Sequence, residues 1–196
     1  PDADTLLIGF VGRLVEQKGV DILLDGIQEI LSLPVQLAML GSGEAHFEAA
    51  MTKIATQYAG RVAVKIGYSE SLAHQIEAGA DVFLMPSRFE PCGLNQMYSM
   101  RYGTPPIVRQ VGGLADTVID ANRANVSAKT ATGFVFSGEL GTDLYKTIAR
   151  ACDLYADKNK WKTLQLTGMG HDFSWQNSAE EYLKLYTAAI RENPTV

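Results

Sequence analysis

The chain contains 196 residues, of which 46% are hydrophobic and 20% are charged, and its formal net charge is −5 at pH 7. This length and composition predict one globular domain with a sizeable core. The acidic balance argues against a nucleic-acid-binding protein, which needs a basic face to neutralise phosphates, and no apolar run approaches the length of a membrane span.

Apolar runs alternate with helical periodicity along the first part of the chain. Strands are predicted over residues 6–11, 35–40, 62–66, 80–85 and 105–108, and helices over residues 22–31, 45–58, 72–78, 97–102 and 114–118. This β-α-β-α order predicts a parallel sheet with helices on both faces. Right-handed crossovers then make it a Rossmann-like α/β fold.

The pattern changes beyond Asp120. Small and polar residues predict a surface loop over 121–132, a short apolar run predicts a last strand over 133–136, and helices are predicted over residues 144–155, 158–170 and 177–190. Ser178 fits a helix start, because a glutamate, Glu181, follows three residues later. Without a visible repeat or linker, we predict a single domain over residues 1–196, with C-terminal helices at about 140–190.

The most informative segment is the turn over residues 86–96, between a predicted strand and a predicted helix. It places Glu90 at the carboxyl end of the strand, which is the edge of an open α/β sheet where ligands bind. Gly93 and its neighbours offer backbone N–H groups at a helix start, a natural seat for an anion. A partly buried Glu90 needs partners, which sugar hydroxyls can provide. A salt bridge with Arg88 is the alternative explanation.

Two cations, Arg13 and Lys18, lie in the loop between the first strand and its helix, with Gly12 and Gly19 at the ends of the loop. Charge, backbone donors and the helix dipole favour a diphosphate there. The loop is not a Walker motif, since no glycine precedes Lys18 and no Ser or Thr follows it. Taken alone, both cations are better explained as solvated loop residues, because most Lys and Arg side chains are exposed.

Two weaker signals lie at the same edge of the predicted sheet. Tyr68 follows a strand and a glycine, so its ring could stack on a nucleobase or could simply be a half-buried loop residue. The pair Gly112 and Gly113 precedes a predicted helix and permits close backbone approach. That pair is either a sugar or phosphate contact or a tight turn.

The remaining features bear on cellular setting and on metals. The cysteines, Cys92 and Cys152, make no disulfide framework and suit a reducing compartment. The histidines are scattered, without ligand spacing, so we expect no metal. No signal-peptide pattern opens the chain. Because the first residue is not Met, we expect the chain to be a piece of something longer.

Several motifs together resemble the donor-site region of bacterial glycogen synthases and plant starch synthases. They are Phe-Glu-Pro-Cys-Gly-Leu at 89–94, Gly-Arg-Leu at 12–14 leading to Gln-Lys-Gly at 17–19, Ile-Gly-Tyr at 66–68, and Tyr-Gly-Thr at 102–104 leading to Val-Gly-Gly-Leu at 111–114. The likeness runs from about residue 6 to 186 and covers one half of such an enzyme. It implies the C-terminal half of a glycosyltransferase-B fold.

By this resemblance, Arg13 and Lys18 bind the diphosphate of ADP-glucose and neutralise the leaving group. Tyr68 stacks on adenine. Glu90 contacts the donor glucose or stabilises the developing oxocarbenium charge. The enzymes of this family retain the anomeric configuration, yet the chain shows no second carboxylate of the kind a retaining glycosidase needs at about 5 Å.

The resemblance also assigns roles to the backbone after Glu90. The stretch Cys92-Gly93-Leu94 is expected to contact glucose hydroxyls and phosphate. Many bacterial glycogen synthases carry Thr at the next position, whereas this chain has Asn95, as many plant starch synthases do. An amide can still donate to phosphate, so we retain Asn95 as a binding residue.

The implied function is transfer of glucose from ADP-glucose to the non-reducing end of an α-1,4-glucan, with no metal or other cofactor. The N-terminal acceptor half is missing, including its Lys-Thr-Gly-Gly-like loop, so the isolated chain should bind nucleotide but catalyse poorly. The protein would be cytoplasmic in a bacterium and in the plastid stroma of a plant or alga.

Two alternatives remain. One is a non-catalytic nucleotide-sugar-binding or regulatory domain of the same fold, which would be free to lose Arg13, Lys18 and Glu90. The other is a sucrose synthase-like or mannosyl-transferring enzyme. These often carry a second Glu after a seven-residue gap, where this chain has Tyr98.

Overall fold

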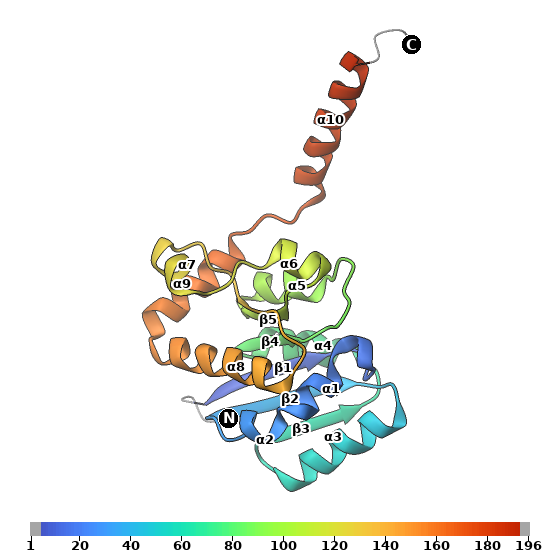
Figure 1. Cartoon of the computed structure of the whole chain (residues 1–196), viewed down its shortest axis with the longest axis vertical. Coiled ribbons are helices and arrows are strands. Elements are labelled where there is room, and N and C mark those ends of the chain that lie inside the picture. Colours follow the sequence, from blue (N-terminus) through green and yellow to red (C-terminus); the bar gives the residue numbers. More distant parts are fainter. Residues whose placement is uncertain (1–4, 193–196) are drawn as a thin grey trace.

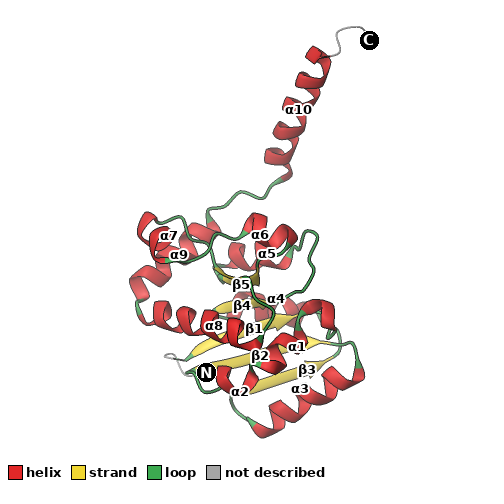
Figure 2. Ribbon diagram, in the orientation of Figure 1, coloured by secondary structure: helices red, strands yellow, loops and turns green. Residues whose placement is uncertain are grey.

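The computed structural model describes residues 5–192 and contains a single six-stranded parallel sheet (Figures 1 and 2). The strands run in the order β3-β2-β1-β4-β5-β6. Their bounds are β1 (Leu6–Val11), β2 (Val35–Gly41), β3 (Val62–Ile66), β4 (Val82–Met85), β5 (Pro106–Arg109) and β6 (Phe134–Phe136). This order is that of a Rossmann fold. Successive strands are added on one side of β1 up to β3, and on the other side from β4 onward, so the strand order reverses between β1 and β4.

Helices cover both faces of the sheet (Figure 1). Their bounds are η1 (Glu16–Lys18), α1 (Val20–Asp25), α2 (Ile27–Ile30), α3 (Ala45–Gln57), α4 (Glu70–Gly79), α5 (Asn95–Tyr102), α6 (Gly112–Thr117), α7 (Arg123–Ala128), α8 (Gly141–Ala156), α9 (Lys158–Met169) and α10 (Trp175–Glu192). Helices α1, α2 and α8 pack together, and α4 packs on β1 and against α5. Helix α10 projects away from the body of the domain (Figure 2).

Packing in the core explains why β1 and β4 lie at the centre of the sheet. All residues of β4, Val82–Met85, are buried, as expected for a parallel strand covered by helices on both faces. In β1, Gly9 lets α4 approach the sheet closely: a Cβ atom there would lie 2.8 Å from Ile76 Cγ2 and 2.9 Å from Ala80 Cβ. Close packing on both faces therefore holds β1 and β4 at the centre of the sheet.

Three details differ from the sequence-based expectation. The predicted loop over 121–132 contains α7, whose first turn is capped by the Asn122 side chain accepting from the Asn125 N–H. The predicted helix start at Ser178 is wrong, because α10 begins at Trp175. The single helix expected over residues 22–31 is divided into α1 and α2.

The division of that helix has a packing cause. A Cβ atom on Gly26 would lie 2.6 Å from the Gly141 carbonyl oxygen at the start of α8. The Gly141 N–H in turn donates to the Asp25 carboxylate at 2.7 Å. The glycines therefore let α1 and α8 meet at backbone distance.

Two further findings concern the whole described region. The α/β fold class is confirmed, while the prediction of a single domain over residues 1–196 stays a prediction. No helix between residues 5 and 192 is long and apolar enough to cross a membrane.

Candidate functional site

The candidate site lies where the strand order reverses, between the loops that follow β1 and β4. These loops touch closely at Gly19, which has φ +70°: a Cβ atom there would lie only 2.0 Å from the Pro86 carbonyl oxygen. The Arg88 N–H donates to the Gln17 carbonyl at 2.9 Å, and the Gln17 amide donates to the Phe89 carbonyl at 3.2 Å. We call residues 12–19, which carry Arg13 and Lys18, the lysine loop, and residues 86–94, which carry Glu90, the glutamate loop. The two loops therefore form one surface.

An ion pair joins the two loops. Lys18 Nζ lies 2.5 Å from Glu90 Oε2, and the Ser87 hydroxyl donates to the same oxygen at 3.1 Å. Glu90 is only 7% exposed, so these partners compensate a carboxylate that is largely withdrawn from water. The structure thus brings together a cation and a carboxylate that the sequence analysis had assigned to separate motifs.

The alternative of an Arg88–Glu90 salt bridge is contradicted. The Arg88 guanidinium donates to Asp21 Oδ2 at 2.6 and 3.1 Å, and to Glu139 Oε2 at 2.8 Å. The hydrogen bond with Asp21 is the main cause that raises the pKa of Arg88 above its ordinary value. Arg88 therefore points away from Glu90 and ties its own loop to α1 and to the segment before α8.

The loop after β4 has little regular structure, yet its carbonyl groups are consistently bonded. Every carbonyl oxygen from Arg88 to Gly93 accepts a hydrogen bond; the donors are Arg109, Gln17, the Gly113 N–H, the Gln96 amide and the Cys92 thiol. Gln96 is completely buried and reaches both the Cys92 and Gly93 carbonyls at 3.1 Å. The loop is consequently held in one shape by groups outside it.

The glycine pair was expected to precede a helix but forms the first two residues of α6, and it takes part in this bonding. The Gly113 N–H donates to the carbonyls of Glu90 at 3.2 Å and Pro91 at 3.3 Å. A Cβ atom on Gly112 would lie 2.1 Å from the Glu90 carbonyl oxygen, and one on Gly113 would lie 2.2 Å from that of Cys92. The pair is therefore needed for close packing against the glutamate loop, and its contact with a ligand stays a prediction.

A small cavity of about 110 Å³ lies between the two loops. Its lining includes Phe10, Val11, Gly12, Lys18, Leu84, Met85, Ser87, Glu90, Gly93, Leu94 and Asn95. Five of the predicted site residues (Lys18, Glu90, Gly93, Leu94 and Asn95) therefore share one cavity.

The other predicted residues lie outside that cavity. Arg13 is exposed, and its guanidinium donates to the Gln17 side chain at 3.0 Å. Tyr68 follows β3 with 88% of its surface exposed. The exposed Cys92 thiol lies instead beside a larger groove of about 800 Å³ between α5 and the segment that leads into α10.

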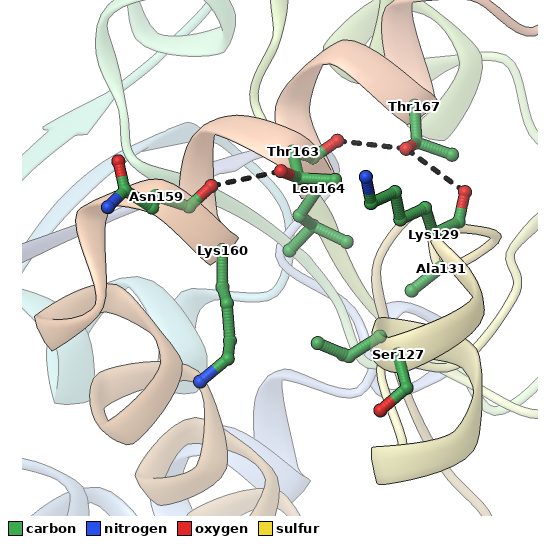
Figure 3. A pocket seen from close by; sticks show the side chains of 9 residues that line it. Ser127, Lys129, Ala131, Asn159, Lys160, Thr163, Leu164 and Thr167 are labelled. Atoms are coloured by element: carbon green, nitrogen blue, oxygen red, sulfur yellow. Dashed lines mark hydrogen bonds between the residues drawn. The ribbon is translucent and has the colours of Figure 1, made fainter.

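A third hollow, of about 270 Å³, lies away from these loops, between α7 and α9 (Figure 3). The Thr163 hydroxyl donates to the Asn159 carbonyl, and the Thr167 hydroxyl donates to the carbonyls of Thr163 and Lys129. Lys160 is paired with Asp157 at 2.7 Å. Both of its threonine hydroxyls and one of its cations are thus engaged within the protein, so we do not regard this hollow as the candidate site.

Residues 5–192 contain no cluster of three or more His, Cys, Asp or Glu side chains that could hold a metal ion. Positive charge at the candidate site comes from the side chains of Lys18 and Arg13.

Sequence reasoning missed three residues that organise the site: Gln17, Gln96 and Arg109. Arg109 carried a usable signal, because it directly follows an apolar strand at the ligand edge of the sheet, as does the segment with Glu90. Gln17 and Gln96 carried none, since their role depends on carbonyl groups brought to them by the fold.

Comparison with known proteins agrees with this geometry. Residues 5–153 match the profile of the family described as "Glycosyl transferases group 1". The chain belongs to this family of glycosyl transferases.

Within the family, the chain is homologous to glycogen synthases. It is 52% identical over 188 residues to a glycogen synthase of Dechloromonas aromatica and 53% identical over 189 residues to glycogen synthase 1 of Methylococcus capsulatus. These matches cover 96% of this chain but only 39% and 38% of the two relatives. The chain thus spans about two fifths of the length of these relatives.

Solved structures give the same result. The catalytic domain of starch synthase IV from Arabidopsis thaliana, bound to ADP and acarbose, is 38% identical, with a TM-score of 0.85 over 96% of this chain and 39% of that chain. A sucrose-phosphate synthase from Thermosynechococcus elongatus is 26% identical, with a TM-score of 0.69 over 98% of this chain and 47% of that chain. The resemblance to the glycogen and starch synthase family, and the glycosyltransferase-B fold it implied, are confirmed.

Proposed function

We propose that this chain is the donor-binding domain, and the C-terminal half, of an enzyme that transfers glucose from ADP-glucose to the non-reducing end of an α-1,4-glucan. The observation that carries the proposal is the meeting of Lys18 and Glu90 in one cavity at the switch point of the sheet. The relatives named glycogen synthase, and the starch synthase with bound ADP, support the choice of donor.

The cavity supplies a cation for the diphosphate and a carboxylate for the sugar. In this arrangement Lys18 moves from Glu90 to share its charge with the diphosphate, and Arg13, which is exposed and follows Gly12 of the cavity lining, adds a second cation. As the glycosidic bond breaks, these cations stabilise the leaving ADP. Glu90 meets glucose hydroxyls and stabilises the positive charge that develops on the ring.

The loop backbone and Tyr68 complete the binding site in this proposal. Gly93, Leu94 and Asn95 border the cavity, where their N–H groups and the Asn95 amide face glucose and phosphate, with Cys92 contributing backbone. The exposed Tyr68 ring is free to stack on adenine. The donor requires no metal or other cofactor here, since Arg13, Lys18 and the helix starts provide the positive charge.

The partners follow from the same proposal. The chain works with an N-terminal half that binds the glucan acceptor and is inactive without it. Helix α10 leaves Trp175, Tyr182, Leu183, Tyr186 and Ile190 exposed, which is the surface expected where another part of an enzyme packs. The bacterial relatives favour the cytoplasm, and the plastid stroma applies if the source is a plant or alga.

The alternatives have less support. A non-catalytic domain of the same fold has no need to keep Arg13, or to keep Lys18 and Glu90 paired in one cavity. An enzyme with two glutamates in the donor loop is disfavoured, because Tyr98 occupies the second position.

Calorimetric titration of ADP, UDP and ADP-glucose into the chain tests the proposal. We expect ADP and ADP-glucose to bind and UDP to bind more weakly. Tighter binding of UDP would favour another sugar donor, and absence of binding by all three nucleotides would overturn the donor-domain assignment.

A further inference from the structure

Arg109, the last residue of β5, carries a buried guanidinium that the proposed chemistry does not use. The residue is 8% exposed. Its Nε donates to the Gly138 carbonyl at 3.0 Å, one Nη donates to the Arg88 carbonyl at 3.0 Å, and the other pairs with the Glu139 carboxylate. Because the N–H groups of a guanidinium form a rigid fork, one side chain fixes three acceptors relative to each other.

Two of these acceptors belong to a network that reaches both sides of the cavity. Glu139 also accepts from the Arg88 side chain at 2.8 Å, so one carboxylate joins two guanidiniums. Arg88 in turn binds Asp21, which lies in α1 just beyond Lys18. The network therefore connects the end of β5, the glutamate loop and the helix that follows the lysine loop.

We propose that Arg109 is a positioning residue for Glu90, acting through the Arg88 carbonyl and through the Glu139 carboxylate that it shares with Arg88. The proposal rests on the function proposed above. Arg88 lies two residues before Glu90, and its N–H, its carbonyl and its side chain are each bonded to a different element. With Arg88 held at these points, the Glu90 carboxylate is kept at the cavity before any donor arrives.

Replacement of Arg109 by Met keeps the volume of the side chain but leaves the carbonyls of Arg88 and Gly138 without their donor. The glutamate loop then moves more freely, while Arg13, Lys18 and Tyr68 keep their own contacts. We therefore expect the variant to lose affinity for the glucose part of the donor and to keep its affinity for ADP, which lacks that glucose.

Hydrogen exchange measured by mass spectrometry tests the positioning without any ligand. The amide hydrogens of Arg88 and Gly113 report on the loop, because they bond the carbonyls of Gln17, Glu90 and Pro91. In Arg109→Met we expect these amides to exchange about tenfold faster, the factor that corresponds to one hydrogen bond to a charged group. Amides of β2 and α3 should keep their rates.

The matched control is Arg150→Met. Arg150 also forms a two-point pair with a carboxylate, at 2.6 and 3.2 Å from the oxygens of Asp120, but it binds no residue of the glutamate loop among its described contacts. It should lower stability without changing exchange at Arg88 and Gly113. Glu139→Ala is a second test, since Glu139 is exposed and its removal leaves no buried gap. It should loosen the loop even if Arg109→Met does not fold.

Calorimetric titration provides a second readout. Arg109→Met should weaken ADP-glucose about tenfold and change ADP less than about twofold. Unchanged exchange at Arg88 and Gly113 in the folded variants, or faster exchange spread evenly over the sheet, would overturn the positioning role. So would equal losses for ADP and ADP-glucose. If the unsubstituted chain binds neither nucleotide, the proposed function fails and the exchange data alone decide the role of Arg109.

Discussion

Lys18 and Glu90, which are 72 positions apart in the sequence, form an ion pair of 2.5 Å between the loops after β1 and β4. The pair links the two chemical roles proposed for the site. The Glu90 carboxylate pairs with the Lys18 ammonium, which in the proposed function engages the diphosphate. The Lys18 ammonium in turn provides a partner for a carboxylate that is nearly buried. The contact therefore joins the two loops in the folded domain, and in the proposed function the same two groups bind the donor.

Removal of Lys18 should destabilise the domain through Glu90. Lys18→Met leaves a largely buried carboxylate with the Ser87 hydroxyl as its remaining side-chain donor, so we expect the free energy of unfolding to fall by about 1–3 kcal/mol. Urea denaturation measures this fall. The double variant Lys18→Met, Glu90→Gln should recover most of the loss, because the amide carries no charge. A double variant less stable than Lys18→Met would contradict the pairing.

Removal of Arg13 should act on binding and leave stability intact. Arg13 is exposed, so Arg13→Ala should change the free energy of unfolding by less than about 0.5 kcal/mol. If Arg13 engages the diphosphate, ADP affinity should fall about tenfold, whereas adenosine affinity should not change. Titration of both ligands measures the difference, and an equal loss for adenosine would rule out a phosphate-specific role.

The exposed ring of Tyr68 gives a separate prediction. Stacking of a base on an aromatic side chain is worth about 1–3 kcal/mol, so Tyr68→Ala should weaken ADP by that amount while Tyr68→Phe retains the affinity. Calorimetry on the two variants provides the comparison. Unchanged affinity in Tyr68→Ala would remove the stacking assignment.

Glu90→Gln tests the catalytic proposal in a full-length enzyme that contains this domain. The amide preserves the shape of the side chain but removes its charge, so kcat should fall far more than KM for ADP-glucose rises. Melting temperature is measured on the same variant. A lower melting temperature with normal turnover per folded molecule would show that Glu90 is a structural residue and would end the catalytic interpretation.

Glu77 on α4 predicts a dependence of stability on pH. Burial is the main cause that raises its pKa above the ordinary value of 4.5, against the opposing effect of His74 at 3.3 Å. A raised pKa means that Glu77 contributes stability at pH values below about 4.5, and that this contribution is lost as the pH rises through the pKa of the folded state. Glu77→Gln should therefore gain stability relative to the unsubstituted chain as the pH increases from 4 towards 7.

Urea denaturation across that pH range checks the trend. Glu70→Gln, at an exposed position of the same helix, is the matched control and should show little change. A constant difference between Glu77→Gln and the unsubstituted chain at all pH values would contradict the role of burial.

The sequence by itself determined the α/β architecture and predicted the strand ends at which the candidate site lies. Alternating apolar runs placed the six strands, because buried parallel strands and amphipathic helices leave periodic patterns in the chain. The local pattern failed where burial was weak. Helix α7 lacks an apolar stripe, and α10, whose described side chains are exposed, begins ahead of the predicted helix start at Ser178.

The partners of the charged residues were decided only by the tertiary structure. The alternative in which Arg88 pairs with Glu90 is contradicted, because Arg88 binds Asp21 and Glu139, and the glycine pair at 112–113 packs against the glutamate loop. These contacts join segments that are distant in the sequence and meet only when β1, β4 and β5 lie side by side in the sheet. Sequence periodicity records which side chains are buried, whereas the choice among several nearby opposite charges depends on three-dimensional distances that no local pattern contains.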